Sequence, residues 1–132
     1  MIRTYTATFL LTASVNAGTV QFGNTFDPVA GLSGGGVPVN GELMGIQTQW
    51  NPTQSGGTAS VATVGQGGTS EILLNAVGGT SLWYYPHVQS QTTAGAAITG
   101  WYDRFPIDDN VNLVVSGGTA PGTVTVKMLL RQ

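Results

Sequence analysis

Alternation of apolar and polar residues with a period of two is the feature that most constrains this chain. Between Arg3 and Val15 the odd positions are mostly apolar and the even positions are mostly threonine or serine. The pattern returns over 111–116 and 123–131. This spacing is typical of strands with one buried face, and threonine suits the pleated surface. No window shows a sustained helical period free of glycine and proline. The sequence therefore predicts an all-β chain with almost no helix.

Glycine-rich segments punctuate these candidate strands. Gly-Gly-Thr occurs at 56–58, 67–69 and 78–80, eleven residues apart each time, and again at 117–119. That interval has room for a strand of about seven residues and a turn. We expect residues 1–132 to form a single antiparallel β-sandwich domain, jelly-roll-like, with eight or nine short strands. Residues 24–40, rich in glycine and proline, are expected to form a long loop.

Low charge is the most unusual property of the composition. Only 8% of the residues are charged, against about 25% in typical soluble domains. The four cations can neutralise few phosphates, so we expect no nucleic-acid binding. Depletion of charge is typical of the centre of a protein–protein interface, although an ordinary threonine-rich β-protein would share it. No apolar run is long enough for a membrane span or a secretory signal, which favours no membrane contact and folding in a cytoplasm.

The residues give no coherent catalytic constellation. The chain has no cysteine, so it has no disulfide or thiolate metal site. The Gly-x-Ser-x-Gly pattern of a nucleophile elbow occurs at Gly31-Leu32-Ser33-Gly34-Gly35. Such an elbow lies between a strand and a helix, and no helix is expected after this segment, so we do not expect a catalytic serine here. Asp103, Asp108 and Asp109 around Arg104 could hold Ca²⁺, could be glycosidase acids, or could form a solvated turn. The single histidine, His87, is more typical of a partly buried turn than of a pH switch. We expect no enzyme activity, no cofactor and no metal.

The aromatic residues are the remaining candidates for function. If residues 82–87 form a strand, Trp83 and Tyr85 share one of its faces. Such rings pack in the core, stack on sugars or make a protein contact. The candidate interface residues are Tyr5, Phe9, Phe26, Trp50, Trp83, Tyr85 and Trp101.

The last third of the chain resembles a known family. The segment Asp108-Asp109-Asn110-Val111-Asn112-Leu113-Val114-Val115-Ser116-Gly117-Gly118, followed by Gly122-Thr123-Val124-Thr125-Val126, resembles a hairpin of small tailed-phage structural proteins. The preceding Ile98-Thr99-Gly100-Trp101-Tyr102-Asp103-Arg104-Phe105-Pro106 is similar to the segment that leads into it. The resemblance covers about residues 96–132 and is to head decoration, or cement, proteins. These are β-sandwiches that sit on the major capsid protein lattice, often as trimers.

The resemblance implies a structural virion protein on the capsid surface, folded in the host cytoplasm. It implies the major capsid protein as partner and a homo-oligomer, with a trimer favoured. An N-terminal arm, residues 1–10, or the loop 24–40 could then reach a neighbouring molecule. Two alternatives stay open: a carbohydrate-binding module that uses Trp83, Tyr85 and Trp101, and a tail or baseplate subunit.

Overall fold

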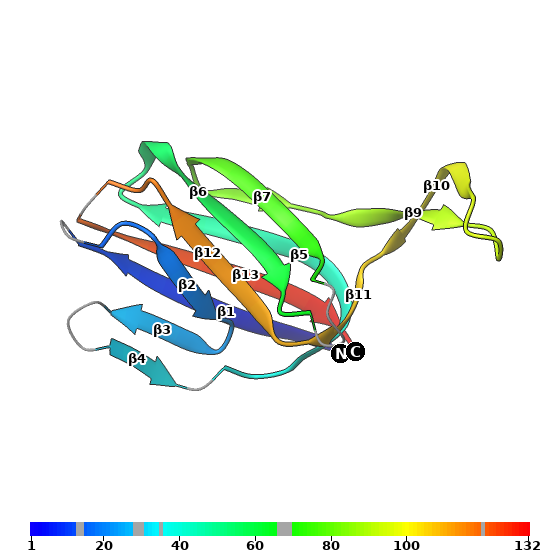
Figure 1. Cartoon of the computed structure of the whole chain (residues 1–132), viewed down its shortest axis with the longest axis horizontal. Helices are drawn as coiled ribbons and strands as arrows, with labels where there is room; N and C mark the ends of the chain where they lie inside the picture. The colour runs from blue at the N-terminus through cyan, green and yellow to red at the C-terminus, as the bar shows by residue number, and fades with distance from the viewer. Residues whose placement is uncertain (13–14, 28–30, 35, 66–69, 120) are drawn as a thin grey trace.

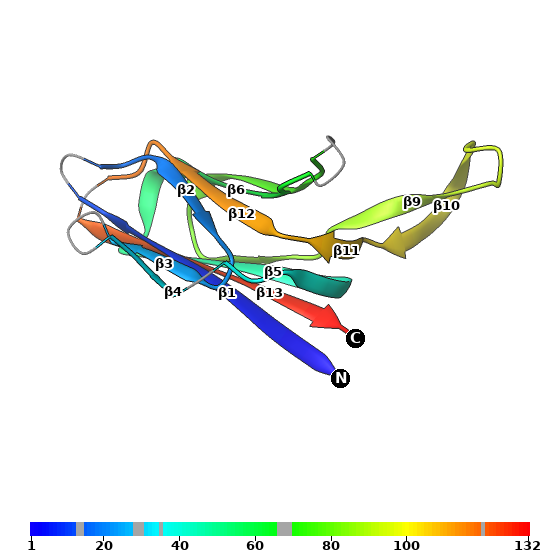
Figure 2. The same ribbon diagram turned by 60° about the horizontal axis from the view of Figure 1, so that its bottom comes forward.

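Two packed β-sheets and a projecting hairpin make up the computed structural model, which describes residues 1–12, 15–27, 31–34, 36–65, 70–119 and 121–132 (Figures 1 and 2). The seven-stranded large sheet holds β1 (Ile2–Leu11), β3 (Asn24–Asp27), β4 (Gly31–Gly34), β5 (Val39–Asn51), β8 (Leu82–Tyr84), β11 (Pro106–Asp109) and β13 (Gly122–Arg131). The four-stranded small sheet holds β2 (Gly18–Gln21), β6 (Gln54–Thr63), β7 (Ile72–Gly79) and β12 (Val111–Ser116). The hairpin consists of β9 (His87–Gln91) and β10 (Ala97–Arg104).

The two ends of the chain form the centre of the large sheet. Its order is β11-β5-β13-β1-β3-β4, with β8 also paired to β5. Strands β1 and β13 pair antiparallel without interruption from Ile2↔Arg131 to Leu11↔Gly122. A shift of one residue would turn every core side chain of β1 to solvent, so the alternating pattern fixes this register.

The core lies between the two sheets. The odd-numbered side chains of β1 face those of β12 and β6 across it, and Phe9 packs on Phe26 with ring centroids 4.9 Å apart. The largest fully buried side chains are Phe9, Phe22, Leu43, Ile46, Leu113, Met128 and Leu130. The alternation on β1, β12 and β13 therefore correctly predicted which faces are buried.

These findings confirm the predicted all-β sandwich, and the described residues contain no helix. Thirteen strands are present among them in place of the eight or nine expected. The strands that were not expected are β3, β4, β9 and β11, which have four or five residues, and β10, which has eight. They are paired through their backbones, which leaves little side-chain pattern in the sequence. Among the described residues, no helix has the length and apolar character needed to cross a membrane.

Two segments differ from the sequence-based expectation. Residues 1–10 are not an arm, because β1 is held between β13 and β3 in the large sheet. Residues 24–40 are not a single loop, because β3 and β4 pair antiparallel within them; residues 28–30 and 35 lie outside the described part. Backbone pairing to the sheet outweighs the glycine and proline content of this segment.

The Gly-Gly-Thr segments do not all act as turns. Residues 56–58 lie inside β6, where the pairing with β7 shifts register between Gln54 and Thr58. Gly57 has φ +98° and lies so close to Trp50 that a Cβ would be 2.7 Å from its ring. Residues 78–80 do end β7, and 117–119 lie between β12 and β13. The repeat at 67–69 lies outside the described residues.

Truncation of the Phe9 ring tests the core. We expect Phe9→Ala to lower the free energy of unfolding by about 3–5 kcal/mol, because it empties a fully buried site against Phe26. Thr4→Ala, on the exposed face of the same strand, should cost less than about 1 kcal/mol. Urea unfolding followed by circular dichroism measures both. Equal costs for the two variants would contradict this description of the core.

Candidate protein-contact surface

The hairpin is an excursion from one edge strand of the large sheet. Strands β8 and β11 both pair antiparallel with β5, and both lie on the edge of β5 that faces away from β13. Strand β8 pairs with residues 46–48 and β11 with residues 39–42. The chain therefore leaves this edge after β8, runs out and back as β9 and β10, and rejoins the same edge opposite Leu43 and Glu42. Met44 and Gly45 lie between the exit and the return. Figures 1 and 2 show the hairpin extending beyond the sandwich.

Hydrogen bonds hold the chain where it approaches this exit. The backbone N–H of Trp50 donates to Ser81 Oγ at 3.0 Å. Thr48 is fully buried, and its hydroxyl donates to the carbonyl of Thr80 at 3.2 Å. On the return side, the Leu43 N–H donates to the carbonyl of Phe105 at 2.9 Å. The root of the hairpin is therefore fixed to the body by buried or partly buried contacts.

The hairpin is largely exposed, and most of its length carries no charged residue. Every residue of β10 is exposed, including Trp101 with 68% of its surface accessible. Residues 88–102 contain no charged residue. Ser90 Oγ donates to Asp103 Oδ2 at 2.6 Å, and the rings of His87 and Tyr102 meet edge to face at 4.6 Å. A two-stranded hairpin of this kind has marginal stability alone in water, so cover from a partner would stabilise it.

A hydrophobic depression of about 210 Å³ lies at the root of the hairpin, on the outer face of the large sheet. We call this surface the root patch; its side chains are Ile2, Met44, Trp83, Tyr85 and Leu129. Gly45 lies beneath it, and a Cβ there would be 3.3 Å from the Tyr85 ring. Tyr85 also borders a second depression with His87 and Tyr102 on the hairpin. The root patch and the hairpin thus form one continuous surface.

The structure separates the predicted interface residues into two groups. Trp83, Tyr85 and Trp101 are exposed on the root patch and hairpin. Tyr5, Phe9 and Trp50 are core residues, with exposed fractions of 7%, 0% and 3%, so their assignment to an interface was wrong. They lie on the faces of β1 and β5 that turn toward the small sheet. Phe26 is half-buried against Phe9.

Several residues of this surface could not be predicted from the sequence. Tyr102 lies next to the predicted Trp101, and its side chain is exposed because the hairpin extends beyond the sandwich. Ile2, Met44 and Leu129 come from three different strands and meet only through the register of β1, β13 and β5. No short-range signal in the sequence joins them.

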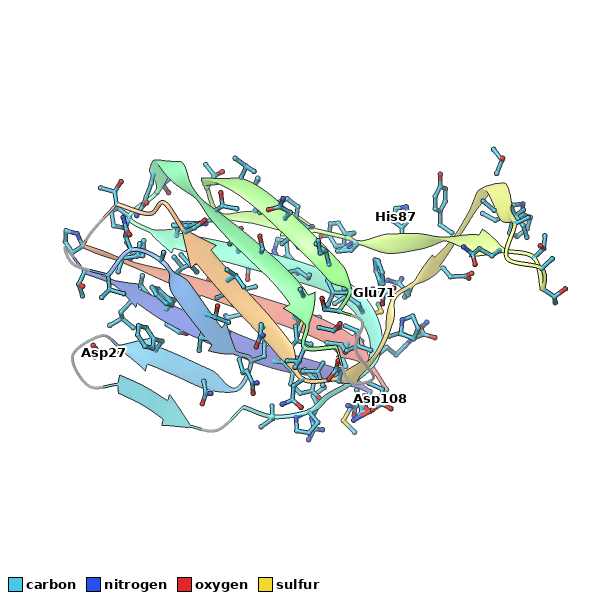
Figure 3. All side chains as sticks on the ribbon, viewed as in Figure 1. Asp27, Glu71, His87 and Asp108 are labelled. Carbon is cyan, nitrogen blue, oxygen red and sulfur yellow. The ribbon has the colours of Figure 1, made fainter. Side chains whose placement is uncertain are left out.

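The other candidate chemistry is dispersed. Asp103 bonds to Ser90 on the hairpin, whereas the Asp109 carboxylate accepts the N–H of Gly65 at 2.8 Å. Figure 3 shows Asp27 at the opposite end of the sandwich from Asp108, with His87 on the hairpin. No group of three His, Asp or Glu side chains that could hold a metal occurs in the described ranges, so the carboxylates expected around Arg104 do not gather there.

Two further expectations concern single motifs. Gly31–Gly34, the described part of the Gly-x-Ser-x-Gly motif, is strand β4, and no helix follows it within the described residues; Gly35 lies outside them. His87 lies in strand β9 and is exposed, whereas a partly buried turn was expected. Its Nδ1 is 3.2 Å from the Tyr85 carbonyl oxygen.

Comparisons with known proteins give one structural similarity. No family model matches the sequence, and no curated protein matches it. Among solved structures, the crystal structure of PirA is similar over 96% of this chain and 92% of the PirA chain, at 12% sequence identity and a TM-score of 0.42.

The register of β8 and β11 predicts a deletion that the fold tolerates. Removal of the eighteen residues Pro86–Asp103 places Arg104 opposite Met44 and keeps Phe105 opposite Leu43, so one continuous edge strand results. We expect this variant to retain its β-type circular dichroism and to unfold cooperatively. Its free energy of unfolding should lie within about 1 kcal/mol of the parent value, because an isolated hairpin adds little to the core.

A deletion one residue shorter is the matched control. Removal of Pro86–Tyr102 slips β11 by one position, which turns the buried Ile107 toward solvent. This variant should be distinctly less stable in the same urea titration. If both deletions unfold the protein equally, the hairpin is not an excursion from a single edge strand.

Proposed function

We propose that this chain is a structural virion protein of the capsid decoration type, which binds the major capsid protein through the hairpin and the root patch. The observation that carries the proposal is the hairpin itself, which extends from the sandwich, carries no charge over residues 88–102 and exposes every residue of β10. Protein contacts are centred on aromatic side chains and are depleted in charge. Trp101 and Tyr102, with the adjoining Trp83 and Tyr85, supply these features.

The resemblance to decoration proteins supports the same surface. It begins at about residue 96 and therefore includes β10, the strand of the hairpin that bears Trp101, and then runs through β11, β12 and β13. The low overall charge also favours dense packing on a shell, since little Coulomb repulsion opposes the approach of neutral surfaces. In this proposal the protein is not an enzyme and needs no cofactor.

One observation favours a second function, the binding of carbohydrate. The exposed rings of Trp83 and Tyr85 are nearly parallel, with an interplanar angle of 12° and centroids 6.4 Å apart. Aromatic faces of this kind can stack on the apolar faces of sugar rings. A tail or baseplate subunit would use the same hairpin on a different virion protein.

Co-sedimentation with capsids tests the proposal. Shells would be assembled from the major capsid protein encoded in the same genome, and the chain would be added over a concentration series. We expect Trp101→Ala combined with Tyr102→Ala to weaken binding at least about thirtyfold, because truncation of a central aromatic contact costs about 2 kcal/mol or more.

The matched control is Val64→Ala combined with Val114→Ala, which removes exposed apolar side chains outside the hairpin and root patch and should leave binding unchanged. Undiminished binding by the Trp101 and Tyr102 variant would refute the hairpin as the contact. Glycan-array binding that is lost in Trp83→Ala would favour the carbohydrate function instead.

A further inference from the structure

A polar depression lies on the outer face of the large sheet, the face turned away from the small sheet. Its volume is about 400 Å³, and its lining comes from β5, β13 and the residue that precedes β8. Trp50 and Val124 are buried toward the core, so the residues that alternate with them point outward. The outward side chains in the lining are Gln49, Asn51, Thr123 and Thr125, joined at the sheet edge by Ser81. None of these side chains is charged.

The side chains of this polar depression have hydrogen-bonding capacity to spare. In the described part of the chain, the four outward side chains form no hydrogen bond with another protein group. Ser81 Oγ accepts the N–H of Trp50 and keeps its own O–H to donate. By contrast, Ser60 on the small sheet donates to Asn75 Oδ1 at 2.9 Å. A ligand in the depression therefore meets amide and hydroxyl groups that can both donate and accept hydrogen bonds.

An aromatic surface adjoins the depression on the same face. Trp83 lies opposite Gln47 in the pairing of β8 with β5, and Gln49 is two residues further along β5, about 7 Å away. The rings of Trp83 and Tyr85 are exposed and nearly parallel, with an interplanar angle of 12°. Stacking surfaces and free hydrogen-bonding groups thus follow one another along one strand.

This combination restricts the chemistry of a ligand. The uncharged lining offers no ion pair, so a charged group would lose hydration there without compensation. Most sites for apolar small molecules have a mainly apolar lining, which this depression lacks. A sugar has hydroxyl groups that donate and accept, and its ring has an apolar face that can stack on an aromatic side chain. Neutral sugars therefore fit both parts of the surface.

We propose that the outer face of the large sheet binds a neutral oligosaccharide, whose rings stack on Trp83 and Tyr85 and whose hydroxyl groups bind in the polar depression. Residues 45–51 of β5 span about 20 Å, which gives room for several linked sugar units. The inference rests on the carbohydrate function named above as the second candidate, and it assigns a polar subsite to that function. The side chains of the polar depression belong neither to the hairpin nor to the root patch, so they can be changed without altering the surface proposed for capsid contact.

One cation lies near this site. Lys127 is opposite Gln47 in the pairing of β13 with β5, and it alternates with the outward Thr125. It does not line the polar depression. Binding of a neutral sugar should therefore persist in Lys127→Gln and should change little with salt concentration, because no counterions are displaced.

A glycan array that carries neutral and acidic oligosaccharides of matched length tests the inference on the full chain. We expect binding to neutral members, and isothermal titration calorimetry with the strongest of them gives the affinity. Gln49→Ala combined with Asn51→Ala should weaken binding about tenfold or more, because two amide groups that bind hydroxyls are lost. Thr125→Val keeps the shape of the side chain and removes its hydroxyl, and should weaken binding about threefold or more.

The matched control is Ser60→Ala combined with Asn75→Ala, which removes polar side chains from the small sheet and should leave sugar binding unchanged. Circular dichroism checks that all variants stay folded. The Gln49 and Asn51 variant should still sediment with capsids like the parent chain, and the Trp101 and Tyr102 variant should still bind sugar, so the two functions fail separately. Binding to acidic glycans alone, no binding to any glycan, or full affinity in both depression variants would overturn the proposal.

Discussion

The unbroken pairing of β1 with β13 is the constraint on which the rest of this structure depends. It joins the two ends of the chain over ten residue pairs, and β13 pairs on its other side with β5. This register turns one face of three long strands toward the small sheet and so assembles the core. It also leaves one edge of β5 open to β8 and β11, which fixes where the hairpin leaves the body and returns to it.

The sequence predicted the parts of the fold that alternation specifies. The strands at 2–11, 111–116 and 122–131, their buried faces and the absence of helix all follow from a period of two. The buried face of strand β5 was harder to predict, because its pairing shifts register opposite Leu129 and Leu130. Odd-numbered side chains such as Val39 and Leu43 are buried before the shift, and even-numbered ones such as Ile46 and Trp50 are buried after it. The short strands β3 and β4 pair with each other, and β3 also pairs with β1, whereas the composition of this segment is typical of a loop.

The candidate site could be predicted only in part, for a related reason. Aromatic residues are recognised easily in a sequence, but their burial depends on which face of a strand they occupy and on what covers that face. Trp83, Tyr85 and Trp101 are exposed, whereas Tyr5, Phe9 and Trp50 fill the core. That β8 and β11 continue one edge strand is a property of long-range register, and nothing local distinguishes them from two unrelated strands. The alternating strands thus form the sandwich, whereas the exposed hairpin interrupts one edge of its large sheet.

We propose that the hairpin is a contact element that extends from a sandwich able to fold without it. Hydrogen–deuterium exchange of the backbone amides, measured on the free chain and on the chain bound to assembled particles, tests it most directly. In the free chain, the amides of 87–104 should exchange orders of magnitude faster than those of β1 and β13, since a two-stranded hairpin opens with little cost. On particles they should become protected while β1 and β13 stay as they were. Slow exchange of the hairpin in the free chain, or no gain of protection on binding, would contradict the account.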